Sequence, residues 1–320
     1  MPSSAAPSGQ PPAAHPPSPS LPSDPLWPRA GDWPALGADA VDLALLGIGT
    51  HRTSLSPTGA HATPAAVRAA LRRYSPYVYG HDDDGPGGGL GAVRCADAGD
   101  VTEPDDHEAR ATAAAARAAA LARVTMVLGG DNAATVPAAL GAWGSGIASA
   151  GLVTLDAHHD LRDGVSNGSP VRRLIEAGLD PRRVVQVGIA DFANSERYAA
   201  RARELGITVI HRDELHVRPM ADLMAEALEI AGAGGGVVHV DLDVDVCDRS
   251  VAPGCPASVP GGIAAHELRS AARAAGTHPA VRSVDVTEVD ATADVPDGRT
   301  VRLAALCVLE VAAGLARRAA

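Results

Sequence analysis

The stretch LVTLDAHHD (residues 152–160) is a short apolar run that passes directly into acidic and histidine side chains. A second stretch, VVHVDLDVD (residues 237–245), is organised in the same way. Short runs rich in Val and Leu, followed at once by polar residues, are typical of strands buried on both faces of a parallel sheet. Each stretch therefore predicts a buried strand whose end carries polar side chains.

Similar apolar runs recur along the chain and alternate with helical stretches rich in Ala, Arg and Glu. The expected strands are 41–49, 124–129, 152–155, 184–189, 208–210, 237–244 and 283–286. The expected helices include 63–74, 107–122, 193–205, 220–231 and 264–275. This alternation predicts a single layered α/β domain with a mostly parallel sheet, over residues 37–320.

Composition narrows the class of protein. The chain has 320 residues, of which 46% are hydrophobic, so a sizeable core can form. A net charge of −11 argues against a nucleic-acid partner or an acidic membrane surface. No apolar run reaches the roughly 18 residues of a membrane span, the first residues lack the basic start and apolar stretch expected of a secretory signal, and the four cysteines show no CxxC pairing. We therefore expect a cytoplasmic protein with no membrane partner.

The N-terminal segment differs from the rest in composition. Residues 1–36 contain 11 of the 25 prolines, interleaved with Ser and Ala. Such a segment buries too little apolar surface to offset the entropy of ordering it. We predict a disordered tail over these residues.

Polar clusters follow four of the expected strands. They are Asp131–Asn132, Asp156–Asp160, Asp241–Asp248 and Glu288. Ligands of parallel α/β sheets bind beyond the carboxyl ends of the strands. We expect these clusters to converge on one acidic, histidine-containing patch.

The spacing within two clusters predicts a divalent-metal site. On an extended segment, Asp156, His158 and Asp160 at i, i+2 and i+4 point to one side. Asp243 and Asp245 repeat the pattern on another strand. Four carboxylates and one imidazole favour Mn²⁺, or else Fe²⁺ or Co²⁺, over a thiolate-type zinc site. Two such ions would relieve the repulsion among the carboxylates and make water nucleophilic at neutral pH.

Neighbouring residues are interpreted differently. A single Asp-x-Asp pattern after a strand usually forms a turn or a helix cap. A metal site is favoured only because two such clusters occur, at the ends of separate strands. Asp241 lies deeper on the strand that carries Asp243, so we expect it to be structural. His159 alternates with His158 and is expected to pack away from the site. Cys247 lies inside the acidic loop and suggests sensitivity to oxidation.

Six motifs, in order, resemble the ureohydrolase family, which includes arginases, agmatinases and formimidoylglutamases. They are GIGTHRTSLSPTGAHATPAAVR (47–68), LGGDN (128–132), LDAHHDLRDG (155–164), NGSPVR (167–172), DLDVDVCDRSVAPG (241–254) and VDVTEVDATAD (284–294). The resemblance covers roughly residues 42–315. It implies a three-layer α/β/α arginase-like fold, two Mn²⁺ per chain, hydrolysis of a C–N bond in a guanidino or formimidoyl group, and a homo-oligomer.

The same resemblance implies roles for the acidic residues and for Asn132. Asp156 and Asp243 would bridge the ions, Asp160 would complete the shell of one, and His158 and Asp245 that of the other. Asn132 occupies a position where most members have a histidine ligand, and its amide oxygen would take the place of that ligand, as a weaker donor to Mn²⁺. Glu288 matches the glutamate that binds the cationic amidine of the substrate, and Asp160 would pass a proton to the leaving amine.

Within the family, the chain is most similar to the formimidoylglutamase branch. The segment DAHHDLR and the segment FANS (192–195) resemble that branch, and Asn167-Gly168-Ser169 replaces the His-Gly pair of arginases and agmatinases. Arg162 and Arg172 would bind substrate carboxylates as forked cations, with Asn167 and Ser169 beside them. The expected substrate is a small amidine, N-formimidoyl-L-glutamate, an intermediate of histidine breakdown that would yield L-glutamate and formamide.

Two alternatives stay open from the sequence. One is hydrolysis of agmatine or a guanidino acid with release of urea. The other is a non-catalytic binding subunit, suggested by Asn132 and Asn167 at two positions where relatives carry histidine.

Overall fold

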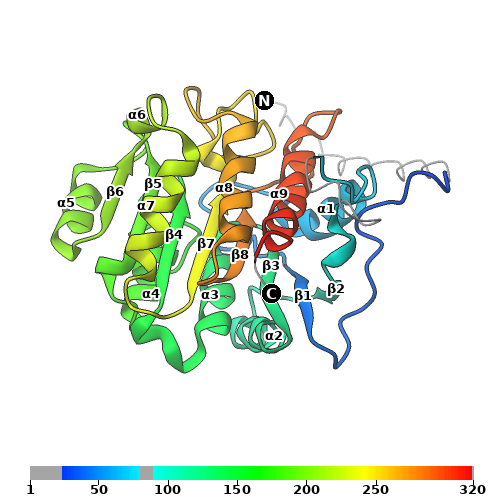
Figure 1. Ribbon diagram of the computed structural model, residues 1–320. Coiled ribbons are helices and arrows are strands. Elements are labelled where there is room, and N and C mark those ends of the chain that lie inside the picture. The colour runs from blue at the N-terminus through cyan, green and yellow to red at the C-terminus, as the bar shows by residue number, and fades with distance from the viewer. Residues whose placement is uncertain (1–23, 80–88, 319–320) are drawn as a thin grey trace, which may run out of the picture.

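A computed structural model describes residues 24–79 and 89–318. Its centre is a parallel sheet of eight strands in the order β2-β1-β3-β8-β7-β4-β5-β6 (Figure 1). The strands are β1 Val41–Ile48, β2 Cys95–Asp100, β3 Ala122–Gly129, β4 Gly151–Leu155, β5 Val184–Ile189, β6 Thr208–His211, β7 Val238–Asp243 and β8 Val281–Thr287. The sheet is flanked by helices, which confirms the expected α/β class.

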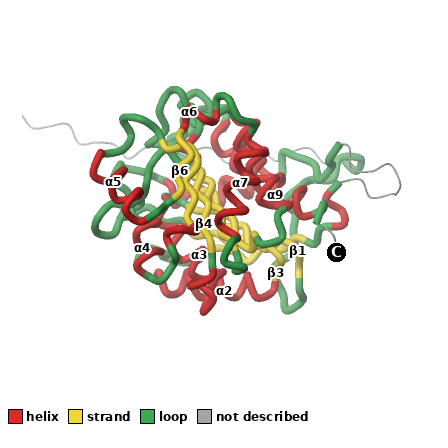
Figure 2. Tube along the Cα trace, turned by 60° about the vertical axis from the view of Figure 1, so that its left-hand side comes forward, coloured by secondary structure: helices red, strands yellow, loops and turns green. Residues whose placement is uncertain are grey.

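The helices form two layers, one on each face of the sheet (Figure 2). One layer contains α1 Thr63–Leu71, α7 Met220–Gly232, α8 Ala265–Thr277 and α9 Arg299–Leu315. The other contains α2 Glu108–Leu121, α3 Thr135–Trp143 and α4 Pro170–Glu176. Two further helices, α5 Glu196–Leu205 and α6 Arg212–Leu215, accompany the edge strand β6. This is the three-layer arrangement that the family resemblance implied.

Alternate residues of the strands supply the two halves of the core. On β4, Val153 and Leu155 belong to the cluster that includes α7, α8 and α9, whereas Leu152 belongs to the cluster around α3 and α4. Because both faces are covered, the strand is fully buried. This explains why its sequence is apolar without the polar alternation of a half-exposed strand.

All seven expected strands are present, and each of their ends lies within two residues of the expected position. The sheet also contains β2, which the sequence did not predict. β2 has the sequence CADAGD, pairs with β1 alone among the strands, and becomes exposed toward its end. An edge strand of this kind needs no β-branched residues, so the apolar pattern could not indicate it. The helix α9 is buried over most of its surface, from Thr300 to Leu315.

Residues 1–23 of the expected tail lie outside the described residues. Residues 24–36 are described and contact the domain. Ala30 is buried, and Ala35 forms an isolated bridge to Asp97 of β2. The boundary expected near residue 36 thus falls within a segment that packs against the sheet edge. Along the two described stretches, no helix combines the length and the apolar character needed to cross a membrane.

Candidate metal and substrate site

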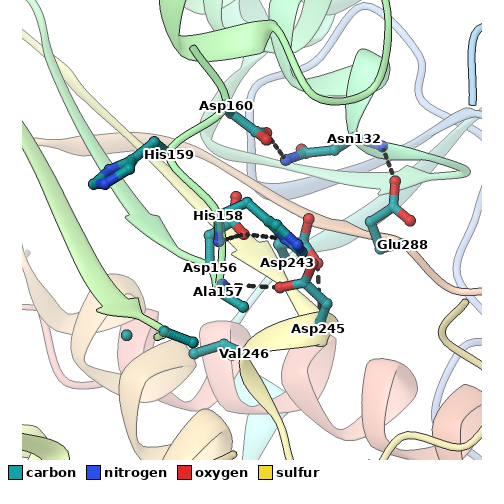
Figure 3. Close-up of polar contacts among 12 residues, drawn as sticks. Asn132, Asp156, Ala157, His158, His159, Asp160, Asp243, Asp245, Val246 and Glu288 are labelled. Carbon is teal, nitrogen blue, oxygen red and sulfur yellow. Dashed lines mark hydrogen bonds and ion pairs between the residues drawn. The ribbon is translucent and has the colours of Figure 1, made fainter. Parts of the chain in front are cut away.

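The four polar clusters converge at the carboxyl ends of β3, β8, β7 and β4, which are neighbours at the centre of the sheet. Asn132 follows β3, Asp156 follows β4, Asp243 ends β7 and Glu288 follows β8. Figure 3 shows these side chains around a common region. The convergence predicted from the strand ends is therefore present in the structure.

Asp156, His158 and Asp245 form the tightest group of possible metal ligands. One ligand atom from each lies within 4.8 Å of the others. The His158 ring points at the two carboxylates (Figure 3), with Nδ1 2.7 Å from Asp245 Oδ2 and 3.5 Å from Asp156 Oδ1. Asp243 adjoins the group, because its Oδ1 accepts a hydrogen bond of 2.9 Å from the Asp245 backbone N–H. Three buried carboxylates and an imidazole thus face one another.

The electrostatics of this group favour a positive charge at its centre. Burial alone would lower the pKa of His158, but the charges of Asp245 and Asp156 and their hydrogen bonds raise it to about 12. Burial, and then the charge of Asp245, raise the pKa of Asp156 to about 7. Burial and the same neighbour also raise the pKa of Asp243. The carboxylates repel one another and stabilise a cation between them.

The segment after β4 turns, which corrects the extended geometry expected for residues 156–160. β4 ends at Leu155, and the His158 backbone N–H donates to Asp156 Oδ1 at 2.6 Å, closing a local turn. Asp160 has a left-handed backbone with φ of 52°. As a result, Asp160 does not point at Asp245 with His158. Its carboxylate accepts a hydrogen bond from Asn132 instead (Figure 3).

Asn132 joins Asp160 to Glu288. Its Nδ2 donates to Asp160 Oδ2 at 2.7 Å, and its backbone N–H donates to Glu288 Oε1 at 2.9 Å. Its Oδ1 accepts from the hydroxyls of Thr135 and Thr287. The amide oxygen is therefore turned away from the carboxylates, whereas a metal ligand at Asn132 would have to present that oxygen to the ion. In this structure Asn132 is a hydrogen-bond donor to Asp160.

Glu288 is a buried carboxylate with a left-handed backbone, φ 58°. Its Oε1 accepts a second hydrogen bond, of 2.8 Å, from Asn167 Nδ2. Burial raises the pKa of Glu288 to about 8, although the bonds from Asn167 and Asn132 oppose this. Asp241 lies one row deeper in the sheet than Asp243 and accepts a hydrogen bond from Thr287 Oγ1, as expected of a structural residue.

A cavity of about 250 Å³ opens over the group. His158, Asp160, Asp243, Asp245 and Glu288 line it on the metal side, and Arg162, Asn167, Gly168, Asn194, Ser195 and Tyr198 contribute to the rest. Arg162 is exposed, and within the described stretches no residue pairs with its guanidinium. A Cβ on Gly168 would lie 2.7 Å from Arg162 Cδ, so this glycine gives the arginine stem its space.

Arg172 and Ser169 do not line this cavity, which corrects their expected role in substrate binding. The Arg172 guanidinium is bound to the carbonyl oxygens of Arg162 and Gly164 and to Glu176. Ser169 is buried, and its hydroxyl donates to the Ser166 carbonyl oxygen. Both residues brace the loop that carries Arg162. The helix α4 (Pro170–Glu176) begins directly after Ser169. The start of this helix directs the side chains of Arg172 and Ser169 toward that loop.

Sequence reasoning did not assign any role to Gln186, Asn194 or Tyr198. Asn194 and Tyr198 line the cavity, and Gln186 contacts the segment after β4. The motif FANS marked the position of Asn194, but nothing in a buried strand sequence singles out Gln186.

The fold and the site together define an α/β protein with an acidic, histidine-containing ligand group at the carboxyl edge of a parallel sheet. The chain belongs to the arginase family, whose sequence model matches residues 41–314.

Several known proteins are similar to this chain over most of its length. A formimidoylglutamase of Halalkalibacterium halodurans is 32% identical over 89% of this chain and 92% of its own. The proclavaminate amidinohydrolase of Streptomyces clavuligerus is 32% identical over 84% of this chain and 83% of its own. The solved structure of a formimidoylglutamase from Bacillus subtilis superposes with a TM-score of 0.84 at 27% identity, covering 94% of this chain and 96% of that one.

Proposed function

We propose that this protein hydrolyses the formimidoyl C–N bond of N-formimidoyl-L-glutamate, giving L-glutamate and formamide, with two Mn²⁺ ions bound per chain. The observation that carries the proposal is a single cavity with an acidic, imidazole-containing floor and an unpaired arginine. The formimidoylglutamases among the relatives support the same substrate.

The residues present fit a pair of divalent ions. The group already stabilises a cation, because it holds a proton on His158 with a pKa of about 12. Asp156, His158, Asp243 and Asp245 would hold the ions, with Asp160 beside them, and this oxygen-rich set with one nitrogen suits Mn²⁺. When bound, such ions neutralise the carboxylates and make water available as a nucleophile at neutral pH.

Glu288 is placed to hold the amidine end of the substrate. Its Oε1 accepts from Asn132 and Asn167, which fixes the carboxylate in one orientation against the cavity. Oε2 then remains for a planar, cationic amidinium, the kind of partner that a carboxylate binds with charge-assisted hydrogen bonds. Glu288 would thereby orient the reacting carbon of the substrate toward the floor of the cavity.

Asp160 is placed to carry a proton to the leaving amine. It lines the cavity, and burial, followed by the charge of Asp156, raises the pKa of its carboxyl. A raised pKa allows the carboxyl to hold a proton near neutral pH. Asn132 Nδ2 bonds to Oδ2 and leaves Oδ1 for that proton.

Arg162 supports an acidic substrate. Its guanidinium offers five donors in a fork that matches a carboxylate, and the stem lies across Gly168 within the cavity lining. An agmatine-type substrate, which is cationic at both ends, would be repelled by it. Arg162 is the one arginine among the described residues that line the cavity, so the second carboxylate of the substrate would rely on neutral donors.

A second candidate is hydrolysis of a guanidino acid with release of urea. The Streptomyces amidinohydrolase relative favours it, and Glu288 would bind a guanidinium as readily as a formimidoyl group. A third candidate, a non-catalytic binding subunit, is motivated by Asn132 and Asn167, which replace histidines of other members.

A substrate panel separates the three candidates. Manganese-loaded protein would be offered N-formimidoyl-L-glutamate, guanidino acids of different length, and agmatine, and glutamate, formamide and urea would be measured. We expect glutamate and formamide from the first substrate only. Release of urea from a guanidino acid at a higher kcat/KM would favour the second candidate, and no turnover by a chain that binds Mn²⁺ would favour the third.

A further inference from the structure

The segment between β4 and the loop of Arg162 carries His158 and Asp160 but has almost no regular backbone pairing of its own. β4 stops at Leu155, and Asp160 has a left-handed φ of 52°, a conformation that costs free energy for a residue with a side chain. Buried backbone N–H and C=O groups need partners. Backbone groups bind Asp156 N–H and the carbonyls of Ala157 and Asp160, whereas both backbone groups of His159 are bound by side chains, from a neighbouring strand and loop.

Asn194, in the loop after β5, holds this segment from one side. Its Nδ2 donates to the Ala157 carbonyl at 2.8 Å and to the Ala190 carbonyl at 3.2 Å. Its Oδ1 accepts from the His159 backbone N–H at 2.9 Å. Since carbonyls only accept and a backbone N–H only donates, the orientation of this amide is fixed.

Gln186, a fully buried residue of β5, holds the same segment from beneath. Its Nε2 donates to the His159 carbonyl at 2.8 Å, which turns Oε1 toward the His159 ring. Nδ1 of that ring lies 2.7 Å from Oε1 and must carry the hydrogen, because an amide oxygen only accepts. Figure 3 shows the His159 ring turned away from His158 and from the acidic group.

We propose that Gln186, Asn194 and His159 form a clamp that positions His158 and Asp160 for the divalent ions. The clamp rests on the proposed function, because it assumes that these ions bind. It fixes the backbone N–H and C=O of His159, the residue between the two side chains that it positions. All three members are positioning residues, and none of them supplies a metal ligand.

The clamp also connects the metal side of the site to the substrate side. Asn194 lines the cavity together with its neighbours Ser195 and Tyr198, whereas Gln186 is buried and is absent from the cavity lining. Loss of Asn194 should therefore disturb both metal binding and substrate binding. Loss of Gln186 should disturb metal binding, and it should affect the cavity wall only through His159, which lines the cavity and whose ring and carbonyl Gln186 binds.

The test compares Gln186→Met and Asn194→Ala with Glu310→Gln. Gln186→Met keeps the length of the side chain without its hydrogen bonds. Glu310 joins α9 to Arg269 and Arg273 of α8, outside the cavity lining, so Glu310→Gln reports on destabilisation alone. The dissociation constant for Mn²⁺ would be measured calorimetrically on metal-free protein, together with the Mn²⁺ electron paramagnetic resonance spectrum, the melting temperature without metal, and KM.

Outer partners of metal ligands typically contribute about 10- to 100-fold in metal affinity. We expect each clamp variant to bind Mn²⁺ at least about 10-fold more weakly, with an altered Mn²⁺ spectrum, and Asn194→Ala to raise KM more than Gln186→Met does. Glu310→Gln should lower the melting temperature without changing Mn²⁺ affinity.

Three results would overturn the proposal, and they can be told apart. Wild-type affinity for Mn²⁺ in folded Gln186→Met and Asn194→Ala, or an equal loss of affinity in Glu310→Gln, overturns the clamp alone. A wild-type chain that binds no Mn²⁺ overturns the metal assignment and the clamp with it. Should Gln186→Met fail to fold, Asn194→Ala, at a part-buried position, decides the question by itself.

Discussion

The ends of β4 and β7 carry the same kind of acidic motif but are built differently. After β7, Asp243 caps the next turn through its bond to the Asp245 N–H, and the chain continues by backbone pairing of Val246 with Ile263. After β4, the chain turns irregularly, and Gln186 and Asn194 bind its backbone through their side chains. Both ends have a local cap and some backbone pairing, but the β4 end is held in addition by the side chains of Gln186 and Asn194, which bind the backbone of His159.

This difference suggests that the two strand ends contribute to the site in different ways. The β7 end supplies fixed carboxylates that face both His158 and the cavity. The β4 end supplies His158 and Asp160, whose positions depend on residues from β5 and its loop. Substitutions at the two ends, in the cavity and elsewhere should therefore have effects of different size and kind.

The largest effect is expected from Asp243→Ala. Its carboxylate lies at the end of a central strand that backbone pairing holds in the sheet, so the fold should remain while metal binding and activity are lost. The loss of activity should exceed the roughly 100-fold typical of outer partners of metal ligands. Metal content after gel filtration, circular dichroism and turnover would be compared with wild type. Normal turnover by this variant would refute the two-ion assignment.

Glu288→Gln should reduce kcat/KM by about 100- to 1,000-fold, the range seen when one charge-stabilising group is removed from an active site. The amide oxygen can still accept from Asn132 and Asn167, so Mn²⁺ affinity should be close to that of wild type. Steady-state kinetics and Mn²⁺ titration check both parts. A parallel loss of Mn²⁺ affinity would show that Glu288 belongs to the metal-ligand group and does not act by binding the substrate.

Arg162→Met should raise KM for an acidic substrate by about 10- to 100-fold, because a hydrogen bond to a charged group contributes about 1.5–3 kcal/mol. Arg172→Met is the matched control, since its guanidinium faces the loop and Glu176. It should change KM much less. Equal effects of the two substitutions would mean that Arg162 acts only by holding the loop.

Without metal, the melting temperature should fall as the pH rises from about 5 to 9. The folded-state pKa values of Asp156, Glu288 and His158 are raised to about 7, 8 and 12, so the native chain binds more protons than the unfolded chain across this range. The protonation of these groups contributes to the free energy of unfolding in full at a pH below their unfolded-state pKa values. This contribution is lost as the pH rises toward their folded-state pKa values. Calorimetry with chelator and with Mn²⁺ checks this.

Saturating Mn²⁺ should flatten that dependence, because metal in place of protons neutralises the same carboxylates. Glu288→Gln without metal should show a smaller fall than wild type. A melting temperature that rises with pH in the metal-free wild type would contradict the electrostatic account.

The smallest effect is expected at the cysteines. All four are buried, and burial raises the pKa of Cys247 and Cys255 well above the usual value and that of Cys95 and Cys307 to about 12. A thiol kept protonated and out of solvent reacts slowly. Labelling of the native protein with a thiol reagent at pH 8 should be minimal, and Cys247→Ser should not alter inactivation by peroxide. Protection by that substitution would restore the oxidation-sensitive role suggested by the sequence.

The sequence predicted which residues meet but not how each one is held. Apolar runs followed by polar residues placed Asp156, His158, Asp243 and Asp245 correctly at one edge, because parallel strands share that edge. Asp160 would share a face with Asp156 and His158 only if the strand continued, and the chain instead turns at His158.

Other features depend on contacts between distant segments. Arg172 has the residue type of a carboxylate-binding side chain, yet the start of α4 turns it toward the loop of Arg162. In the sequence, Gln186 is a single polar residue within a buried strand. Its hydrogen-bond partner lies in the segment after β4, which is distant in the sequence. Local pattern carries no information about either contact.

The most direct test is a titration of the metal-free wild-type chain with Mn²⁺, followed by measurement of the metal retained after gel filtration. We expect two ions per chain for wild type and loss of both in Asp243→Ala. Retention of fewer than one ion per wild-type chain would contradict this expectation.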